Sequence, residues 1–334
     1  MAGPFFSVVI PTYNRCEAVL RCLDALARQT LEMDQFEVIV VVDGSTDGTT
    51  AKLGSLKPLY DFRFVEIENG GAGYARNAGA KMARGEYIAF TEDDVTPDTN
   101  WLLNARAHLR RGSHAVLEGR TVYEGSTRSV RRHEPPGIFS FIPCNVFVLR
   151  TAFDASGGYD PEFFDRKRRL YFREDSDLGF RLLDTGHAAA IAQDVIVSHP
   201  QQFESLSACI RHARRYVFDP LLYKRHPVRY RKMIEVKHLA GLTVRRPQHS
   251  VALLDLAAVV VALAGLVEWG TTWTFVGLAV SLACAFLFRL KYQGRNALRI
   301  DQLHSTFGFW VVPFVYLYSL VRGCFRYRTA GVLI

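Results

Sequence analysis

The chain has 334 residues, of which 49% are apolar and 22% charged, and its formal net charge is +8. This length allows one large globular domain and an appended module. Its six cysteines are scattered without CxxC spacing, which argues against a zinc site or a disulfide framework and favours a reducing cytosolic compartment. The N-terminus, MAGPFFSVVIP, has no charged leader and only a short apolar run, so we expect this end to stay in the compartment where it is made.

The positive charge is concentrated in one stretch. Residues 201–250 hold eleven Lys or Arg against three acidic residues, a local net charge of +8. From Val251 to Phe288, the only charged residues are Asp255 and Glu268. A basic stretch beside an apolar one predicts a polybasic collar at an anionic membrane surface. Nucleic-acid binding is the alternative, but no nucleic-acid motif accompanies the charge, so we expect no nucleic-acid partner.

The first hundred residues alternate between strand and helix patterns. Short apolar, β-branched runs predict strands, and apolar residues at helical spacing predict helices between them. The expected strands lie at 5–10, 36–42, 62–67 and 86–90, and the expected helices near 19–27, 47–55 and 73–83. This order predicts an α/β fold with a Rossmann-like, mostly parallel sheet and right-handed crossovers. Ligands of such sheets bind beyond the carboxyl ends of the strands.

The pattern from 100 to 200 is mixed. We expect a helix at 100–111, a strand at 115–123 and a charged, proline-containing loop at 124–137. A second segment that we expect to contribute to the site follows from Cys144 to Arg181. The order of the strands in this region stays open.

Two uniformly apolar segments, 251–267 and 272–288, follow the basic stretch. Each has about 17 residues, the short limit for a transmembrane helix, and the link between them allows only a hairpin. Basic residues flank both outer ends, which predicts that both ends face the cytoplasm. A buried helical hairpin in a soluble core is the alternative. Two tryptophans at the turn, Trp269 and Trp273, fit an interfacial aromatic belt.

A third apolar segment, 306–321, is aromatic and contains Pro313. Three arginines follow it, at 322, 326 and 328. If this segment crossed the membrane, these arginines would lie outside, against the positive-inside rule. We therefore expect an interfacial helix rather than a third span.

Five motifs in a fixed order resemble the family 2 glycosyltransferases, inverting enzymes of the GT-A fold, over roughly residues 5–215. They are VVIPTYNR (8–15), VVDGSTDGT (41–49), GGAGYARNAG (70–79), AFTEDDVTPDTNWL (89–102), and GGYDPEFF with FREDSDLGFRL (157–182). The resemblance implies transfer of one sugar from a nucleotide-diphosphate sugar. We expect a UDP-sugar, with a GDP-sugar as the alternative.

Three acidic residues, Glu92, Asp93 and Asp94, follow the expected strand at 86–90. Adjacent carboxylates repel one another, so a bound cation or ligand gives a reason to keep them together; a solvated acidic turn is the alternative. Oxygen ligands beside a diphosphate suit Mg²⁺ or Mn²⁺. The resemblance implies a DXD-type motif with Asp94 and Glu92 as metal ligands and Asp93 near the ribose. His199 can supply an imidazole to the same metal or can be structural.

Asp43 ends the second expected strand, where its carboxylate can accept the N3–H of a uracil ring or can cap the next turn. By resemblance, Pro11, Thr12 and Asn14 line the same nucleotide pocket. Arg76 follows a glycine-rich loop and can pair with a diphosphate or with the base-binding carboxylate. The glycine spacing matches neither a Walker loop nor a dinucleotide fingerprint, which argues against ATPases and dehydrogenases.

Glu174 and Asp175 begin an expected helix, where acidic residues also act as caps. The resemblance makes Asp175 the general base that takes the proton of the acceptor hydroxyl, and Glu174 an acceptor-binding residue. Direct attack on the anomeric carbon inverts it and needs no covalent nucleophile.

We therefore expect a GT-A catalytic domain over 1–235 and an α-helical membrane module over 236–334. The expected location is the inner (plasma) membrane, multi-pass, with the catalytic domain in the cytoplasm. The expected acceptor is membrane-embedded, such as a polyprenyl-diphosphate-linked glycan in cell-surface polysaccharide or glycan assembly. A transferase that uses polyprenyl phosphate as acceptor is the alternative, and a catalytically silent scaffold is a third interpretation.

Overall fold

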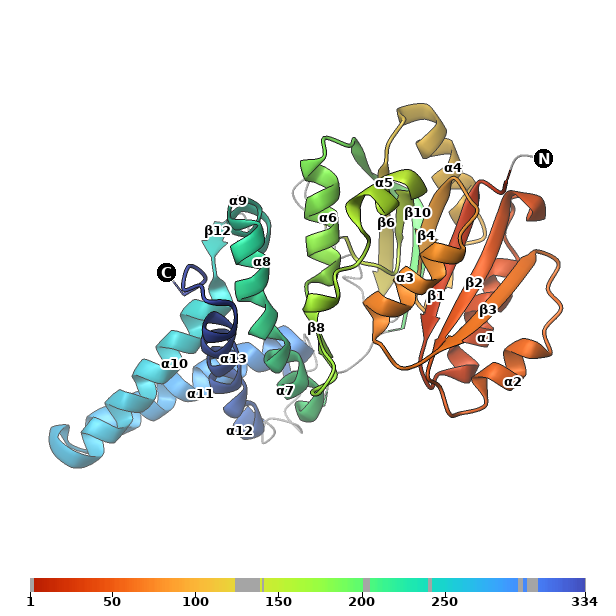
Figure 1. Ribbon diagram of the computed structural model, residues 1–334. Helices are drawn as coiled ribbons and strands as arrows, with labels where there is room; N and C mark the ends of the chain where they lie inside the picture. Colours follow the sequence, from red (N-terminus) through yellow and green to blue (C-terminus); the bar gives the residue numbers. More distant parts are fainter. Residues whose placement is uncertain are drawn as a thin grey trace. The chain divides into compact units, whose positions relative to one another are not determined.

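The structure is a computed structural model that describes residues 3–123, 139, 141–200, 205–239, 242–293, 297–298 and 306–333 (Figure 1). The loop expected at 124–137 lies outside these residues. The chain divides into two compact units, Met1–Gln201 and Gln202–Ile334. This division precedes the expected boundary near 235, because the segment that follows Gln202 packs on the C-terminal helix. The extent of the catalytic domain stays a prediction.

In the part of the N-terminal unit that the structure describes, eight strands form one mixed sheet, in the order β3-β2-β1-β4-β7-β6-β10-β5. The strands are β1 (Phe6–Thr12), β2 (Phe36–Asp43), β3 (Asp61–Ile67), β4 (Tyr87–Phe90), β5 (Thr96–Pro97), β6 (Val116–Tyr123), β7 (Val146–Leu149) and β10 (Ala189–His199). The helices are α1 (Cys16–Ala27), η1 (Met33–Gln35), α2 (Thr49–Gly54), α3 (Ala72–Met82), α4 (Trp101–Gly112), α5 (Arg150–Ser156), η2 (Pro161–Phe163) and α6 (Glu174–Asp184).

The sheet confirms the α/β fold expected from the alternating pattern. β1 pairs in parallel with β2 and β4, and β2 with β3. The second half is mixed: β7 lies antiparallel between β4 and β6, while β6 and β10 are parallel. The carboxyl ends of β1, β2 and β4 therefore meet at one edge.

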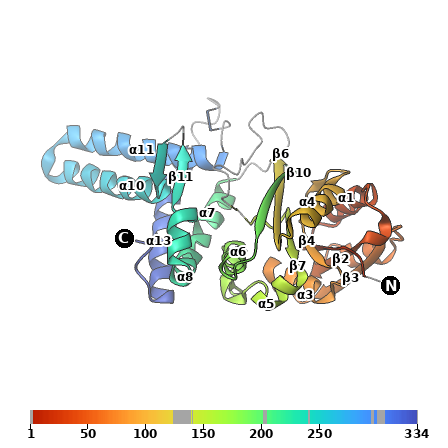
Figure 2. The same ribbon diagram turned by 90° about the horizontal axis from the view of Figure 1, so that it is seen from above.

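Helices cover both faces of the sheet (Figure 2). α1 and α4 contribute Leu26 and Trp101 to the main core, together with inward residues of β1 and β2. α3 packs on the opposite face, against β1 and β2. It approaches so closely that a Cβ at Gly79 would lie 2.4 Å from Val9 Cγ1. Glycine is therefore required there, and it lets α3 lie close against β1 and β2.

The C-terminal unit is mainly helical. It contains α7 (Leu206–Arg215), η3 (Tyr216–Phe218), α8 (Asp219–Arg225), α9 (Pro227–Arg229), η4 (Tyr230–Ile234), β11 (Val236–Leu239), β12 (Leu242–Arg245), α10 (Pro247–Ala264), η5 (Gly265–Trp269), α11 (Thr271–Gln293), α12 (Thr306–Phe309) and α13 (Val311–Tyr327). α10 and α11 form an antiparallel hairpin, and Figures 1 and 2 show α13 crossing it rather than running alongside. α13 packs on α7, η3 and α8.

Among the described residues, three segments are long and apolar enough to cross a membrane, judged by length and composition. They are Pro247–Glu268, Thr271–Gln293 and Thr306–Tyr327, with mean hydropathy 2.5, 1.8 and 1.3. The first two contain the expected hairpin and extend it at both ends. Most of each span is uncovered by protein, with 28%, 33% and 44% of the three windows buried. Uncovered apolar helices of this length fit a lipid surrounding better than a soluble core.

Candidate active site

The acidic turn lies at the edge of the sheet where β1 and β4 end side by side. Because these strands are parallel, the segments that follow them meet. Thr12 Oγ1 donates to Asp93 Oδ2 at 2.7 Å. Arg15 Nη1 donates to Asp93 Oδ1 at 3.1 Å and to Asp94 Oδ2 at 2.7 Å. Thr12 therefore contacts the acidic turn directly, through its hydrogen bond to Asp93.

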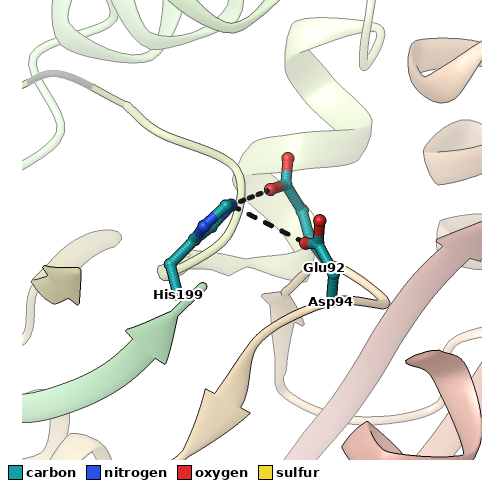
Figure 3. A group of neighbouring side chains, drawn as sticks. All are labelled: Glu92, Asp94 and His199. Atoms are coloured by element: carbon teal, nitrogen blue, oxygen red, sulfur yellow. Dashed lines mark ion pairs between the residues drawn. The ribbon is translucent and has the colours of Figure 1, made fainter. Parts of the chain in front are cut away.

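Glu92, Asp94 and His199 converge on one point (Figure 3). Each offers one ligand atom, and these atoms lie within 4.8 Å of one another. His199 Nε2 is 3.7 Å from both Glu92 Oε2 and Asp94 Oδ1. His199 ends β10, so the group joins residues from the two halves of the sheet. The structure therefore brings together all three residues predicted to bind a metal.

The orientation of His199 suits metal binding. Its Nδ1 lies 2.8 Å from the carbonyl oxygen of Pro200, which can only accept a hydrogen bond. Nδ1 therefore carries the proton, and Nε2 faces the two carboxylates. Atoms 3.7 Å apart can both lie about 2.1–2.2 Å from a single small divalent ion. Two carboxylates and one imidazole are a donor set that Mn²⁺ accepts readily.

Two arginines offset the charge of the acidic turn. Burial lowers the pKa of Arg15, but Asp93 and Asp94 outweigh it and raise the pKa above its usual value. Burial raises the pKa of Asp93, against the opposing effects of Thr12 and Arg15. Arg15 was not predicted as a site residue, because a basic residue in a loop follows no periodic pattern. The one available signal was its place at the end of the PTYNR motif.

Arg76 is the second of these arginines, and it is buried. Its Nη2 lies 3.3 Å from Glu92 Oε1, and its guanidinium lies 5.5 Å from the centroid of the Tyr159 ring. Arg76 therefore forms an ion pair with the acidic turn, not with Asp43, which was one of the alternatives expected from the sequence. Burial raises the pKa of Glu92, but His199 and Arg76 outweigh it and the pKa is lowered.

Asp43 ends β2 and is buried beneath the glycine-rich loop. Its Oδ1 accepts from Gly70 N at 2.7 Å, and its Oδ2 accepts from Gly71 N at 2.9 Å. Burial raises the pKa of Asp43, although these bonds and the charge of Arg169 oppose the rise. Asn69 Nδ2 also donates to Oδ2, at 3.4 Å. Asp43 thus holds the loop, and Oδ1 keeps capacity for a second donor. Contact with a nucleobase stays a prediction.

Asn14 and Pro11 contribute to the shape of this edge. Asn14 adopts a positive φ of 51°, its Oδ1 accepts from Thr46 N at 2.7 Å, and its N donates to Ser45 Oγ at 2.9 Å. Asn14 therefore ties the loop after β1 to the loop after β2. Pro11 is the penultimate residue of β1 and pairs in register with Val41. Their predicted role in lining the nucleotide pocket is not contradicted by these contacts.

The start of α6 carries the predicted base. Asp175 Oδ1 accepts from Ser176 N at 2.6 Å. The residue keeps part of its surface exposed, but protein surrounds the carboxyl, and this burial raises its pKa. Glu174 is buried, with its Cγ 3.7 Å from the position that a Cβ on Gly73 would take. The charge of Arg76 opposes the rise in the pKa of Asp175, and Glu174 in turn raises the pKa of Arg76. Both acidic groups therefore lie near the same guanidinium.

Comparison with known proteins identifies the fold and the chemistry. Residues 7–178 match the family model described as Glycosyl transferase family 2. The chain belongs to this family. It is a glycosyltransferase, as the five motifs predicted.

Among curated relatives, glycosyltransferase AglE of Haloferax volcanii is 39% identical over 212 residues, which cover 59% of this chain and 67% of AglE. Validoxylamine A glucosyltransferase of Streptomyces hygroscopicus subsp. jinggangensis is 43% identical over 94 residues. That match covers 28% of this chain and 22% of the relative, so the chain spans a minor part of it.

Solved structures show the same fold. A mannosyltransferase from Pyrobaculum calidifontis, in complex with GDP-Man and Mn²⁺, aligns with a TM-score of 0.60 at 19% identity and covers 95% of this chain and 87% of its own. The S. aureus TarS 1-349 complex with UDP-GlcNAc aligns with a TM-score of 0.51 at 16% identity, covering 97% and 92%. These likenesses establish the GT-A fold.

Proposed function

We propose that this glycosyltransferase moves a single sugar from a nucleotide-diphosphate sugar, expected to be a UDP-sugar, to a membrane-embedded acceptor with inversion of the anomeric carbon. The acceptor we propose is a polyprenyl-diphosphate-linked glycan in cell-surface polysaccharide or glycan assembly. One observation carries the proposal: Glu92, Asp94 and His199 converge beside the end of β1. Structural neighbours crystallised with GDP-Man and Mn²⁺ or with UDP-GlcNAc support a nucleotide-sugar donor and a divalent ion.

The acidic turn and its arginines are suited to hold the donor. Glu92, Asp94 and His199 would bind Mn²⁺ or Mg²⁺, which when bound neutralises the diphosphate and stabilises it as leaving group. Arg15 is about half exposed, with 48% of its side chain accessible, and it reaches both Asp93 and Asp94. A guanidinium in this position can turn from the carboxylates to a phosphate oxygen without leaving the pocket edge.

Asp175 is suited to the proton transfer. Its carboxylate accepts the proton of the acceptor hydroxyl while the hydroxyl oxygen bonds to the anomeric carbon and the bond to the diphosphate breaks. Burial raises its pKa, which makes it a stronger base than an exposed aspartate. The backbone N–H of Ser176 orients one carboxylate oxygen and leaves the other for the substrate.

Membrane attachment is proposed through the α10–α11 hairpin, with α13 in the interface. α13 packs along α7, η3 and α8, whose exposed residues include Arg211, Arg214 and Lys224. Charged helices are costly in hydrocarbon, so a helix that packs on them belongs at the surface of the bilayer. Its uncovered side carries Tyr318 and Phe325, which suit the headgroup level. This arrangement supports a cytoplasmic catalytic domain at an inner membrane, anchored by two spans.

The test uses the full-length protein in lipid nanodiscs. Nucleotide sugars with different bases and sugars are screened for transfer and for slow hydrolysis, with Mn²⁺, with Mg²⁺ and with EDTA. The proposal expects metal-dependent turnover with one nucleotide class, and transfer to a polyprenyl-diphosphate-linked sugar. Preferential transfer to polyprenyl phosphate would show instead that the product is a lipid-phosphate sugar. Absence of both nucleotide binding and turnover would favour the third interpretation, a catalytically silent scaffold.

A further inference from the structure

A short hairpin with four consecutive basic residues lies between the glycine-rich loop and the predicted base. Its strands are β8 (Phe164–Asp165) and β9 (Leu170–Tyr171), paired antiparallel, and the sequence between them is RKRR (166–169). We call residues 164–171 the basic hairpin. The four basic residues of this hairpin lie outside the quoted motifs and have no role in the proposed transfer.

The hairpin is fixed to the glycine-rich loop. The Phe164 ring lies so close to Gly71 that a Cβ there would be 3.0 Å from its Cε2. Asp165 is buried and accepts from Arg168 at both the backbone N, at 3.1 Å, and Nη1, at 3.2 Å. Arg168 therefore closes the turn, and its charge is compensated within the hairpin.

Arg169 points to the nucleotide edge of the sheet. Its Nη1 lies 3.3 Å from the hydroxyl of Tyr13, and its guanidinium carbon lies 5.7 Å from the centroid of the Tyr13 ring. Tyr13 directly follows Thr12 and is 39% exposed. Within the described part of the chain, no carboxylate lies within ion-pair distance of Arg169. Its charge opposes the rise that burial causes in the pKa of Asp43.

Arg169 thus offers a planar cation with unused hydrogen-bond donors. It lies beside the exposed ring of Tyr13, and its charge reaches Asp43, the carboxylate that ends β2. A guanidinium stacks on planar rings and donates to carbonyl oxygens in its own plane. A nucleobase offers both a π face and carbonyl oxygens, and stacking of this kind tolerates different bases. We propose that the basic hairpin is a nucleobase clamp, in which Arg169 contacts the base of the donor at the Asp43 end of the pocket. This inference rests on the proposed use of a nucleotide-sugar donor.

The experiment compares Arg169→Ala with Lys167→Ala, in the full-length protein in nanodiscs. Both substitutions remove one positive charge from the same turn, but Lys167 is exposed and has no ring or ion-pair contact among the described residues. Affinities for UMP, UDP and GDP are measured by displacement of a fluorescent UDP analogue at 0.15 M salt and constant Mn²⁺. Arg169→Ala should weaken binding about tenfold, and Lys167→Ala less than about twofold because salt screens exposed charges.

The nucleotide series identifies the contact. A contact to the base predicts the same loss for UMP as for UDP, with KM for the donor raised and kcat nearly unchanged. A loss found only with UDP would assign Arg169 to the diphosphate and overturn the clamp. Equal losses of affinity in both variants would mean that only the net charge of the turn matters, which would overturn the clamp. Full recovery of affinity in Arg169→Lys would exclude stacking of a planar group and would overturn it as well. If the wild-type protein binds no nucleotide, the proposed function fails instead.

Discussion

The substitution Asp175→Asn separates catalysis from folding more cleanly than any other at this site. Asparagine keeps an oxygen that can accept the hydrogen bond from Ser176 N, at 2.6 Å in the structure. It removes a charge that burial disfavours, so the melting temperature should stay the same or rise. A positioned base typically contributes about 10²–10⁴-fold to the rate, equivalent to roughly 3–5 kcal/mol of transition-state stabilisation. We expect kcat to fall by this factor and nucleotide affinity to change less than about twofold.

The assay is single-sugar transfer under saturating donor, with nucleotide affinity measured separately by calorimetry. Asp184→Asn, the same change at the exposed end of α6, is the matched control and should leave kcat unchanged. Because only the deprotonated carboxylate accepts a proton, the wild-type rate should fall as the pH drops through the raised pKa of Asp175, and the variant should lose this acid limb. Parallel loss of activity and nucleotide binding would show a structural role and refute the reasoning. Unchanged transfer would refute it as well.

Three further predictions test other parts of the molecule. His199→Ala should weaken Mn²⁺-dependent donor binding at least about tenfold without affecting metal-free binding; equal calorimetric affinities with and without metal in the wild type would contradict the assignment. Glu37 is 1% exposed and accepts from Ser7 Oγ, Arg84 N and Arg84 Nε at 2.6, 2.7 and 2.9 Å. Chemical denaturation of Glu37→Ala should therefore show a free energy of unfolding lower by about 3–5 kcal/mol. A change below about 1 kcal/mol would mean that these hydrogen bonds and ion pairs do not stabilise the fold. Burial raises the pKa of Glu37, but these donors and Arg63 lower it overall, so this stabilisation is complete above about pH 4.3 and is lost as the pH falls through the folded-state value. Finally, a C-terminal reporter should lie on the same side of the membrane as an N-terminal one; opposite sides would make α13 a third span.

The sequence predicted those parts of the molecule that follow a local pattern. Short runs rich in apolar residues located β1, β2, β3 and β4 to within two residues, because runs of this length bounded by turn residues are typical of strands. The convergence of Glu92, Asp94 and His199 was predicted from the acidic residues at a strand end together with the family resemblance, which implied the metal ligands. Metal binding itself stays a prediction.

The parts that were missed depend on contacts between distant segments. Arg15 was not predicted, and Arg76 was predicted for the nucleotide site but not as a partner of Glu92. The two are separated by 61 positions yet contact the same acidic turn, and no local spacing reveals this. β7 has only four residues and enters the sheet antiparallel, so its position follows from its neighbours rather than from its own sequence. The strands of the basic hairpin have two residues each, which is too short for any periodicity to show.

Charge balance explains why the acidic turn and its arginines occur together. Glu92, Asp93 and Asp94 bring three carboxylates to one strand end, and the structure compensates them with Arg15, Arg76 and the imidazole of His199. A divalent ion entering alone would leave this arrangement with excess positive charge, and a diphosphate entering alone would meet three carboxylates. The two together add almost no net charge, so each should favour the binding of the other. Arg15, the more exposed of the two arginines, can then turn to the diphosphate, while buried Arg76 stays with Glu92.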